Sequence, residues 1–212
     1  MRLPACMHRC GAMRTSNLRR GMSVLPGFLE SPGPMPNCSP STPTRSVPEC
    51  PMTTWRSARA FAPVIERWFT NQPGPWTVTH GDFRLDNMLF EIRNGAEPIG
   101  VVDWQTILVG PGTVDVSYFI GASLPTEVRR ASEKDLVRRY HNGLLERGVP
   151  DYSFEQCWNN YRYSAFHGYF MATYAPLLVQ RTERGDAMFA LWVERVAAQL
   201  RDLDSLSVLA QI

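Results

Sequence analysis

Proline recurs every two to five residues between Ser31 and Pro51, and this spacing restricts what the chain can fold into more than any other feature. Each proline removes a backbone hydrogen-bond donor and shifts the preceding residue away from helical angles. Residues 1–52 hold nine of the chain's 17 prolines, with six arginines and two acids. Such a segment buries too little apolar surface to offset the entropy lost on ordering. We expect residues 1–52 to be a disordered Pro/Arg-rich segment; the alternative is a proline-rich or basic interaction arm.

The rest of the chain, residues 53–212, has the pattern of a globular region. The chain has 212 residues, is 44% hydrophobic and carries a formal charge of +2. This charge gives no reason to expect a nucleic acid or a membrane surface as partner. Five cysteines, an odd number, make a poor disulfide framework for this length. We therefore expect reduced thiols in a soluble, cytoplasmic protein.

Periodicity in this region predicts a helix, then a small β-hairpin, then helices to the end. The first helix is expected over residues 53–70, interrupted by Pro63. Strands are expected at residues 76–79, 87–92 and 99–104. The last two are joined by Asn94-Gly95, a strong hairpin signal.

The helical part begins after residues 110–112, and capping-box pairs that start at Ser132 and Ser153 predict two helix starts. The second of these helices is expected to run to about Gln180, and Asp186 is expected to open the last one. Nine aromatic residues lie between residues 152 and 174. Their two helical stripes favour a core helix over an aromatic pocket for a cationic substrate.

Two short motifs carry the chemistry. The first is Thr79-His80-Gly81-Asp82-Phe83-Arg84-Leu85-Asp86-Asn87, and Asp103-Trp104-Gln105 follows it. Asp82 and Asn87 lie on an expected turn between strands, and Asp103 at the end of the second hairpin strand. Three oxygen-bearing side chains are thus expected at the mouth of one small sheet. Mg²⁺ prefers hard oxygen ligands, and one carboxylate and one amide on the metal, with a second carboxylate facing a hydroxyl, is a minimal set for phosphoryl transfer.

The spacing His-Gly-Asp, four residues, Asn, with Asp-Trp-Gln downstream, resembles the catalytic core of the aminoglycoside phosphotransferase and choline kinase-like superfamily. The form of the second motif is most similar to the superfamily's ecdysteroid kinase-like branch, and the match covers roughly Trp76 to Gly121. The resemblance implies an α+β fold: a protein kinase-like C-terminal lobe, mostly helical, whose small β-hairpin carries the catalytic and metal residues. It also implies ATP- and Mg²⁺-dependent phosphorylation of a small-molecule hydroxyl.

The resemblance also implies a role for individual residues. Asp82 would be the catalytic base, and Asn87 and Asp103 would bind the Mg²⁺ ions that bridge the ATP phosphates. His80 would hold the loop by packing and backbone hydrogen bonding, and Asp115 would brace it from the next helix.

Other interpretations of these residues remain open. Arg84 and Asp86 occupy variable positions of the family loop and receive no role. Asp82 taken singly could cap a turn, and Asp103 could end a strand. A metallohydrolase built from His80, Asp82, Asp103 and His141 is a further alternative, although its histidines lack ligand spacing on a shared helix face.

Kinases of this superfamily also use an N-terminal lobe with a phosphate-covering loop and a lysine on the phosphates. The 27 residues between the proline-rich segment and His80 contain no glycine-rich loop, and the chain's one lysine, Lys134, lies downstream. We therefore expect the N-terminal lobe to be absent and the chain to be a truncated phosphotransferase. We also expect self-association through the exposed interlobe face. The alternative function is a non-catalytic kinase-like binding or scaffold protein.

Overall fold

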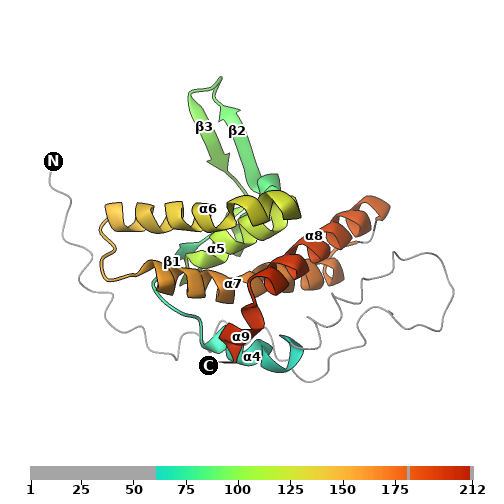
Figure 1. Ribbon diagram of the computed structural model, residues 1–212. Helices are drawn as coiled ribbons and strands as arrows, with labels where there is room; N and C mark the ends of the chain where they lie inside the picture. The colour runs from blue at the N-terminus through green and yellow to red at the C-terminus, as the bar shows by residue number, and fades with distance from the viewer. Residues whose placement is uncertain (1–60, 181, 211–212) are drawn as a thin grey trace. The chain divides into compact units, whose positions relative to one another are not determined.

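The computed structural model describes residues 61–180 and 182–210 (Figure 1). The predicted disordered segment, residues 1–52, lies outside these residues, as does the first part of the helix predicted over 53–70. The described end of that helix consists of a 3-10 turn, Ala62–Val64, and helix α4, Ile65–Thr70. Pro63 stands in the first turn, where its missing N–H has no helical partner to lose.

The β part consists of two separate antiparallel pairs. Strand β1, Trp76–Thr79, pairs with β4, Leu108–Pro111. Strand β2, Met88–Ile92, pairs with β3, Glu97–Val101, and forms the predicted hairpin. The hairpin stands away from the helices in Figure 1. The bounds of β1 and the presence of the hairpin were predicted correctly, but the second hairpin strand was placed too late, at residues 99–104. Strand β4 was not predicted, because glycine and proline at residues 110–111 are typical of a break between elements.

The second hairpin strand ends earlier than predicted, and Asp103 does not lie in it. Strand β3 stops at Val101, and Asp103 adopts left-handed backbone angles, with φ 64° and ψ 55°. A residue in that conformation cannot continue a strand ladder. A short 3-10 turn, Trp104–Thr106, follows and redirects the chain into β4.

Five helices and a π-helical turn complete the described chain. They are α5 (Thr113–Tyr118), the π-helical turn Phe119–Ser123, α6 (Thr126–Glu146), α7 (Phe154–Tyr174), α8 (Glu183–Asp202) and α9 (Ser205–Leu209). The capping box at Ser153 and Gln156 is present and begins α7, as predicted. Helix α7 ends at Tyr174 and passes into a 3-10 turn, Ala175–Leu177, so it is shorter than predicted.

Two predicted helix starts were wrong. Ser132 lies inside α6, where its hydroxyl donates to the Val128 carbonyl, because Pro125 already begins the helix. Asp186 lies in the first turn of α8, one residue past Gly185, whose N–H bonds the hydroxyl of the N-cap residue Thr182.

Helix α7 forms the centre of the core and packs against α5, α6, α8 and α9. Ten of its 21 residues are buried, among them Tyr161, Phe166 and Tyr169. The aromatic stripes therefore form core, as predicted. Buried Cys157 is the described cysteine and carries a free thiol. A mostly helical chain with two small sheets agrees with the predicted α+β class.

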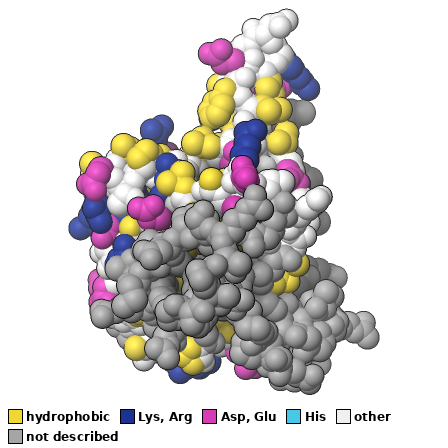
Figure 2. Space-filling model, turned by 90° about the vertical axis from the view of Figure 1, so that its right-hand side faces the viewer, with side chains coloured by type: hydrophobic (Ala, Val, Ile, Leu, Met, Phe, Trp, Pro, Cys, Tyr) yellow, Lys and Arg dark blue, Asp and Glu magenta, His cyan; other side chains and the backbone are white. Residues whose placement is uncertain are grey.

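The surface of the β part is unusually apolar. Figure 2 shows hydrophobic side chains along the β2–β3 hairpin, and Phe90 and Ile99, which face each other across the two strands, are 57% and 52% exposed. Two-stranded hairpins are marginal in water unless something covers a face. The predicted self-association through an exposed face stays a prediction. No helix in the described residues has the length and apolar character to cross a membrane.

Candidate active site

The turn between β1 and β2, residues 80–87, is called the HGD loop below. Its backbone turns at Gly81, which has φ +79°. A Cβ atom at this position would lie 2.5 Å from the Thr106 carbonyl oxygen, so only glycine fits. The Gly81 carbonyl accepts a hydrogen bond of 2.7 Å from Nε2 of His167 in α7. Burial lowers the pKa of His167, which keeps the ring neutral with its proton on the donating nitrogen.

One carboxylate braces the start of the loop from α5. The Asp115 Oδ2 and Oδ1 atoms accept hydrogen bonds from the backbone N–H groups of His80, at 2.7 Å, and Gly81, at 2.9 Å. Hydrogen bonds to a charged acceptor are about twice as strong as neutral ones. These are contacts of the kind that the predicted bracing role of Asp115 requires.

The His80 ring joins the loop to the segment that leads to Asp103. Its Nε2 donates to the Val102 carbonyl at 2.8 Å, and its Nδ1 accepts from the Asp82 N–H at 3.2 Å. The ring also lies 4.7 Å from the Trp104 ring, centroid to centroid. His80 is 1% exposed, so it acts here through packing and backbone contacts.

The Asp82 carboxylate is held by donors on both oxygens. Oδ1 accepts from Nε of Arg84 at 3.0 Å, and Oδ2 accepts from Nδ2 of Asn87 at 2.9 Å. The buried Tyr118 hydroxyl is also a neighbour: burial raises its pKa, and the charge of Asp82 and a hydrogen bond with it raise it further. The Asp82 side chain remains 16% exposed. It is therefore a fixed carboxylate with one face open to solvent.

The Asn87 amide nitrogen donates two hydrogen bonds, and the described contacts assign its amide oxygen none. Nδ2 donates to both the backbone and the side chain of Asp82. The backbone carbonyl of Asn87 accepts a hydrogen bond of 3.0 Å from the Val102 N–H. This bond holds Val102, the residue before Asp103, against the loop. Asp103 itself is exposed, and among the described contacts no hydrogen bond or ion pair joins it to Asp82 or Asn87.

The structure thus connects four of the five predicted site residues by hydrogen bonds and reaches the fifth through the adjacent backbone. The four are His80, Asp82, Asn87 and Asp115. The left-handed conformation of Asp103 does not by itself mark a site, because five other described non-glycine residues also have a positive φ and aspartate tolerates this region better than most residues. The catalytic and metal-binding roles stay predictions.

An amide oxygen and a carboxylate are ligands that Mg²⁺ takes, together with water and phosphate oxygens. The amide oxygen of Asn87, to which the described contacts assign no donor, and the exposed carboxylate of Asp103 fit this requirement. The metallohydrolase alternative is not supported, because the described residues contain no group of three His, Cys, Asp or Glu side chains that could hold a metal. Its second histidine, His141, instead bonds the Tyr152 carbonyl in the core.

Several residues that contact the loop were not predicted. Among them are Thr106, whose hydroxyl donates to the His80 carbonyl at 2.8 Å, and Tyr118 and His167. Thr106 directly follows the second motif in the sequence, and this position could have indicated that it lies near the loop. His167 lies in an aromatic helix 86 residues beyond Gly81, and nothing in the local pattern distinguishes it from a core residue.

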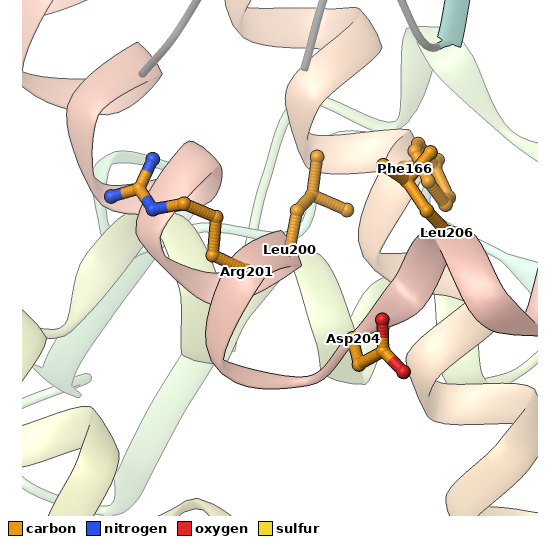
Figure 3. Close-up of a pocket in the computed structure, with 5 residues that line it drawn as sticks. All are labelled: Phe166, Leu200, Arg201, Asp204 and Leu206. Atoms are coloured by element: carbon orange, nitrogen blue, oxygen red, sulfur yellow. The ribbon is translucent and has the colours of Figure 1, made fainter. Parts of the chain in front are cut away.

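A small open pocket of about 250 Å³ lies elsewhere, where α7, α8 and α9 meet (Figure 3). It is lined by Phe166, Leu200, Arg201, Asp204 and Leu206. None of these residues belongs to either motif, so the pocket adds nothing to the candidate site.

The family whose model matches this chain is the one that the two motifs resemble. Residues 54–148 match the model of the ecdysteroid kinase-like family, within the protein kinase-like phosphotransferases, so the predicted resemblance is confirmed. A stretch of 42 residues is 45% identical to acyl-CoA dehydrogenase family member 10 of Mus musculus. That stretch is 20% of this chain and 4% of the mouse protein, so the chain spans a small part of that relative. No solved structure matches the chain.

Proposed function

We propose that this chain, whose residues 54–148 match the ecdysteroid kinase-like family, transfers a phosphoryl group from ATP to the hydroxyl of a small molecule. In this proposal residues 53–212 form the kinase-like C-terminal lobe. The observation that carries the proposal is the pair of Asp82 and Asn87, five residues apart and joined at 2.9 Å on a loop braced from two helices.

Asp82 serves as the base that accepts or orients the hydroxyl proton. A general base needs a fixed carboxylate within hydrogen-bond reach of its substrate. Arg84 and Asn87 fix one oxygen each, and the partial exposure of the side chain leaves room for an acceptor. Phosphoryl transfer depends mainly on positioning and charge stabilisation, which suits a loop held this tightly.

Asn87 and Asp103 are the residues that would hold Mg²⁺. The metal, when bound with ATP, neutralises charge on the phosphates. Val102 links the two segments that carry these residues: its carbonyl accepts from the His80 ring, and its N–H donates to the backbone carbonyl of Asn87.

The proposal is tested by calorimetric titration of MgATP into the full 212-residue chain. We expect saturable binding that weakens about tenfold or more in Asp103→Ala, because a charged metal ligand is lost. Asp151→Ala is the matched control, since Asp151 is also exposed with a left-handed φ of 59° but lies far along the chain, before α7. Its affinity should stay within about twofold of the wild type.

A screen of small-molecule hydroxyl acceptors, with ADP release as the readout, then separates catalysis from binding. Asp82→Asn should bind MgATP but lose nearly all turnover, since an amide cannot accept the proton. If the wild-type chain binds no MgATP, the phosphotransferase proposal is wrong for this chain and the non-catalytic binding protein takes its place.

A further inference from the structure

A single guanidinium lies directly against the predicted base. Arg84 Nε bonds Asp82 Oδ1 at 3.0 Å, and Arg84 Nη1 bonds Asp86 Oδ2 at 2.5 Å. The guanidinium carbon lies 4.2 Å from the centre of the Trp192 ring in α8. An acid on either side and an aromatic face below set both the place and the plane of this cation.

Other basic side chains in this part of the chain are engaged or located elsewhere. Between residues 61 and 123 the basic residues are Arg67, Arg84 and Arg93. Arg67 is an exposed residue of α4, and Arg93 pairs with Glu97 at the hairpin turn. Lys134, the one lysine of the chain, lies on α6 with its Nζ 5.9 Å from the Trp158 ring. Arg195 of α8 donates to the backbone carbonyls of Ala122 and Ser123. Among the described contacts, Arg84 is the cation that bonds carboxylates of the HGD loop.

The two ion pairs of Arg84 differ in how easily they can be exchanged. The Asp82 side chain is 16% exposed, whereas the Asp86 side chain is 62% exposed. An exposed ion pair contributes little free energy because water competes for both charges. Arg84 Nη1 can thus give up Asp86 at low cost while Nε keeps Asp82, and the described contacts assign Nη2 no hydrogen bond.

We propose that Arg84 binds the terminal phosphate of the nucleotide, exchanging Asp86 for phosphate oxygens while it stays on Asp82 and Trp192. This inference rests on the proposed function. A phosphoryl group in line with the acceptor hydroxyl lies next to the base, and the guanidinium touches that base. The planar fork of arginine matches two phosphate oxygens, and a cation already fixed there stabilises the charge that develops during transfer.

The test compares the affinities of the full-length chain for MgATP and MgADP by calorimetry. Only MgATP carries the terminal phosphate, so Arg84→Ala should weaken MgATP binding about tenfold or more and MgADP binding less than about twofold. Arg84→Lys keeps the charge but not the fork and should fall between. Arg93→Ala removes a surface arginine of the hairpin turn and should change neither affinity.

A loss of affinity in Arg84→Ala that is confined to MgATP supports the inference. An equal loss of both nucleotides in Arg84→Ala means that Arg84 only holds the loop, and no loss means that it does not meet the nucleotide; either result overturns the inference and leaves the proposed function intact. If the wild-type chain binds neither nucleotide, the proposed function fails and the role of Arg84 fails with it.

Discussion

The helical core and the β part of this protein are stabilised in different ways. Around α7, Tyr161 and Phe166 are fully buried and contact side chains from several helices. In the two small sheets, apolar side chains such as Phe90 and Val109 are more than half exposed. The helices therefore bury their own apolar surface, whereas the strands present theirs to solvent.

The HGD loop lies at the border between these two regions. Its helical side supplies Asp115 and His167, which hold the backbone of His80 and Gly81. Its other side is the hairpin, from which the chain continues into exposed Asp103. The comparison indicates that the loop carrying the predicted base is held by the helices, whereas the predicted metal ligand Asp103 follows the exposed hairpin.

Two phenylalanines, one in the helical core and one on the hairpin, should differ most in what their truncation costs. Phe166→Ala removes a fully buried ring whose centroid lies 4.6 Å from that of Phe61, and should lower the free energy of unfolding by about 3–5 kcal/mol. Phe90→Ala removes the same ring from the exposed hairpin and should lower the free energy of unfolding by less than about 0.5 kcal/mol. Urea unfolding followed by circular dichroism measures both. A large loss in Phe90→Ala would mean that the hairpin is covered in solution.

A glycine pair tests whether the loop depends on its close approach to the second motif. Gly81→Ala places a Cβ 2.5 Å from the Thr106 carbonyl in a left-handed residue, and should cost about 2–5 kcal/mol of unfolding free energy. Gly148→Ala has nearly the same φ, +82°, and no atom within 4 Å. It should cost only the backbone contribution, about 1–2 kcal/mol. Equal losses in denaturant unfolding would contradict the close approach.

The smallest expected effect is a pH dependence that comes from the helical side of the loop. Burial holds the pKa of His167 below its usual range in the folded protein. As the pH falls below about 6.5, His167 becomes protonated in the unfolded chain but stays neutral in the folded protein. The free energy of unfolding therefore decreases as the pH decreases. The slope contributed is at most about 1.4 kcal/mol per pH unit.

His167→Gln removes the titrating group and keeps an N–H donor for the Gly81 carbonyl. The difference in unfolding free energy between wild type and variant, measured at pH 7.5 and 5.5, should shrink toward acid pH. Comparison with the variant is needed because burial also raises the pKa of Glu133, which changes stability in the opposite direction. A constant difference would show that His167 titrates alike in both states.

Much of the fold near the site could be predicted because its signals are local. Asn94-Gly95 specifies a hairpin turn, and the pair Ser153 and Gln156 specifies a helix start, and both occur in the structure. The spacing of Asp82 and Asn87 likewise predicted a pair that the loop brings within hydrogen-bond distance. In each case the interacting groups are a few residues apart, so the chain has little freedom to place them otherwise.

The family resemblance, the hairpin and the two motifs could be inferred from the amino-acid sequence. The pairing of β4 with β1, and the hydrogen bonds that Asp115 and His167 make to the loop from 34–35 and 86 residues away, depend on the tertiary packing. It also turned Asp103 out of the strand into a left-handed, exposed position. Contacts over such separations depend on how α5 and α7 pack, and packing is a property of the whole core that no local pattern encodes.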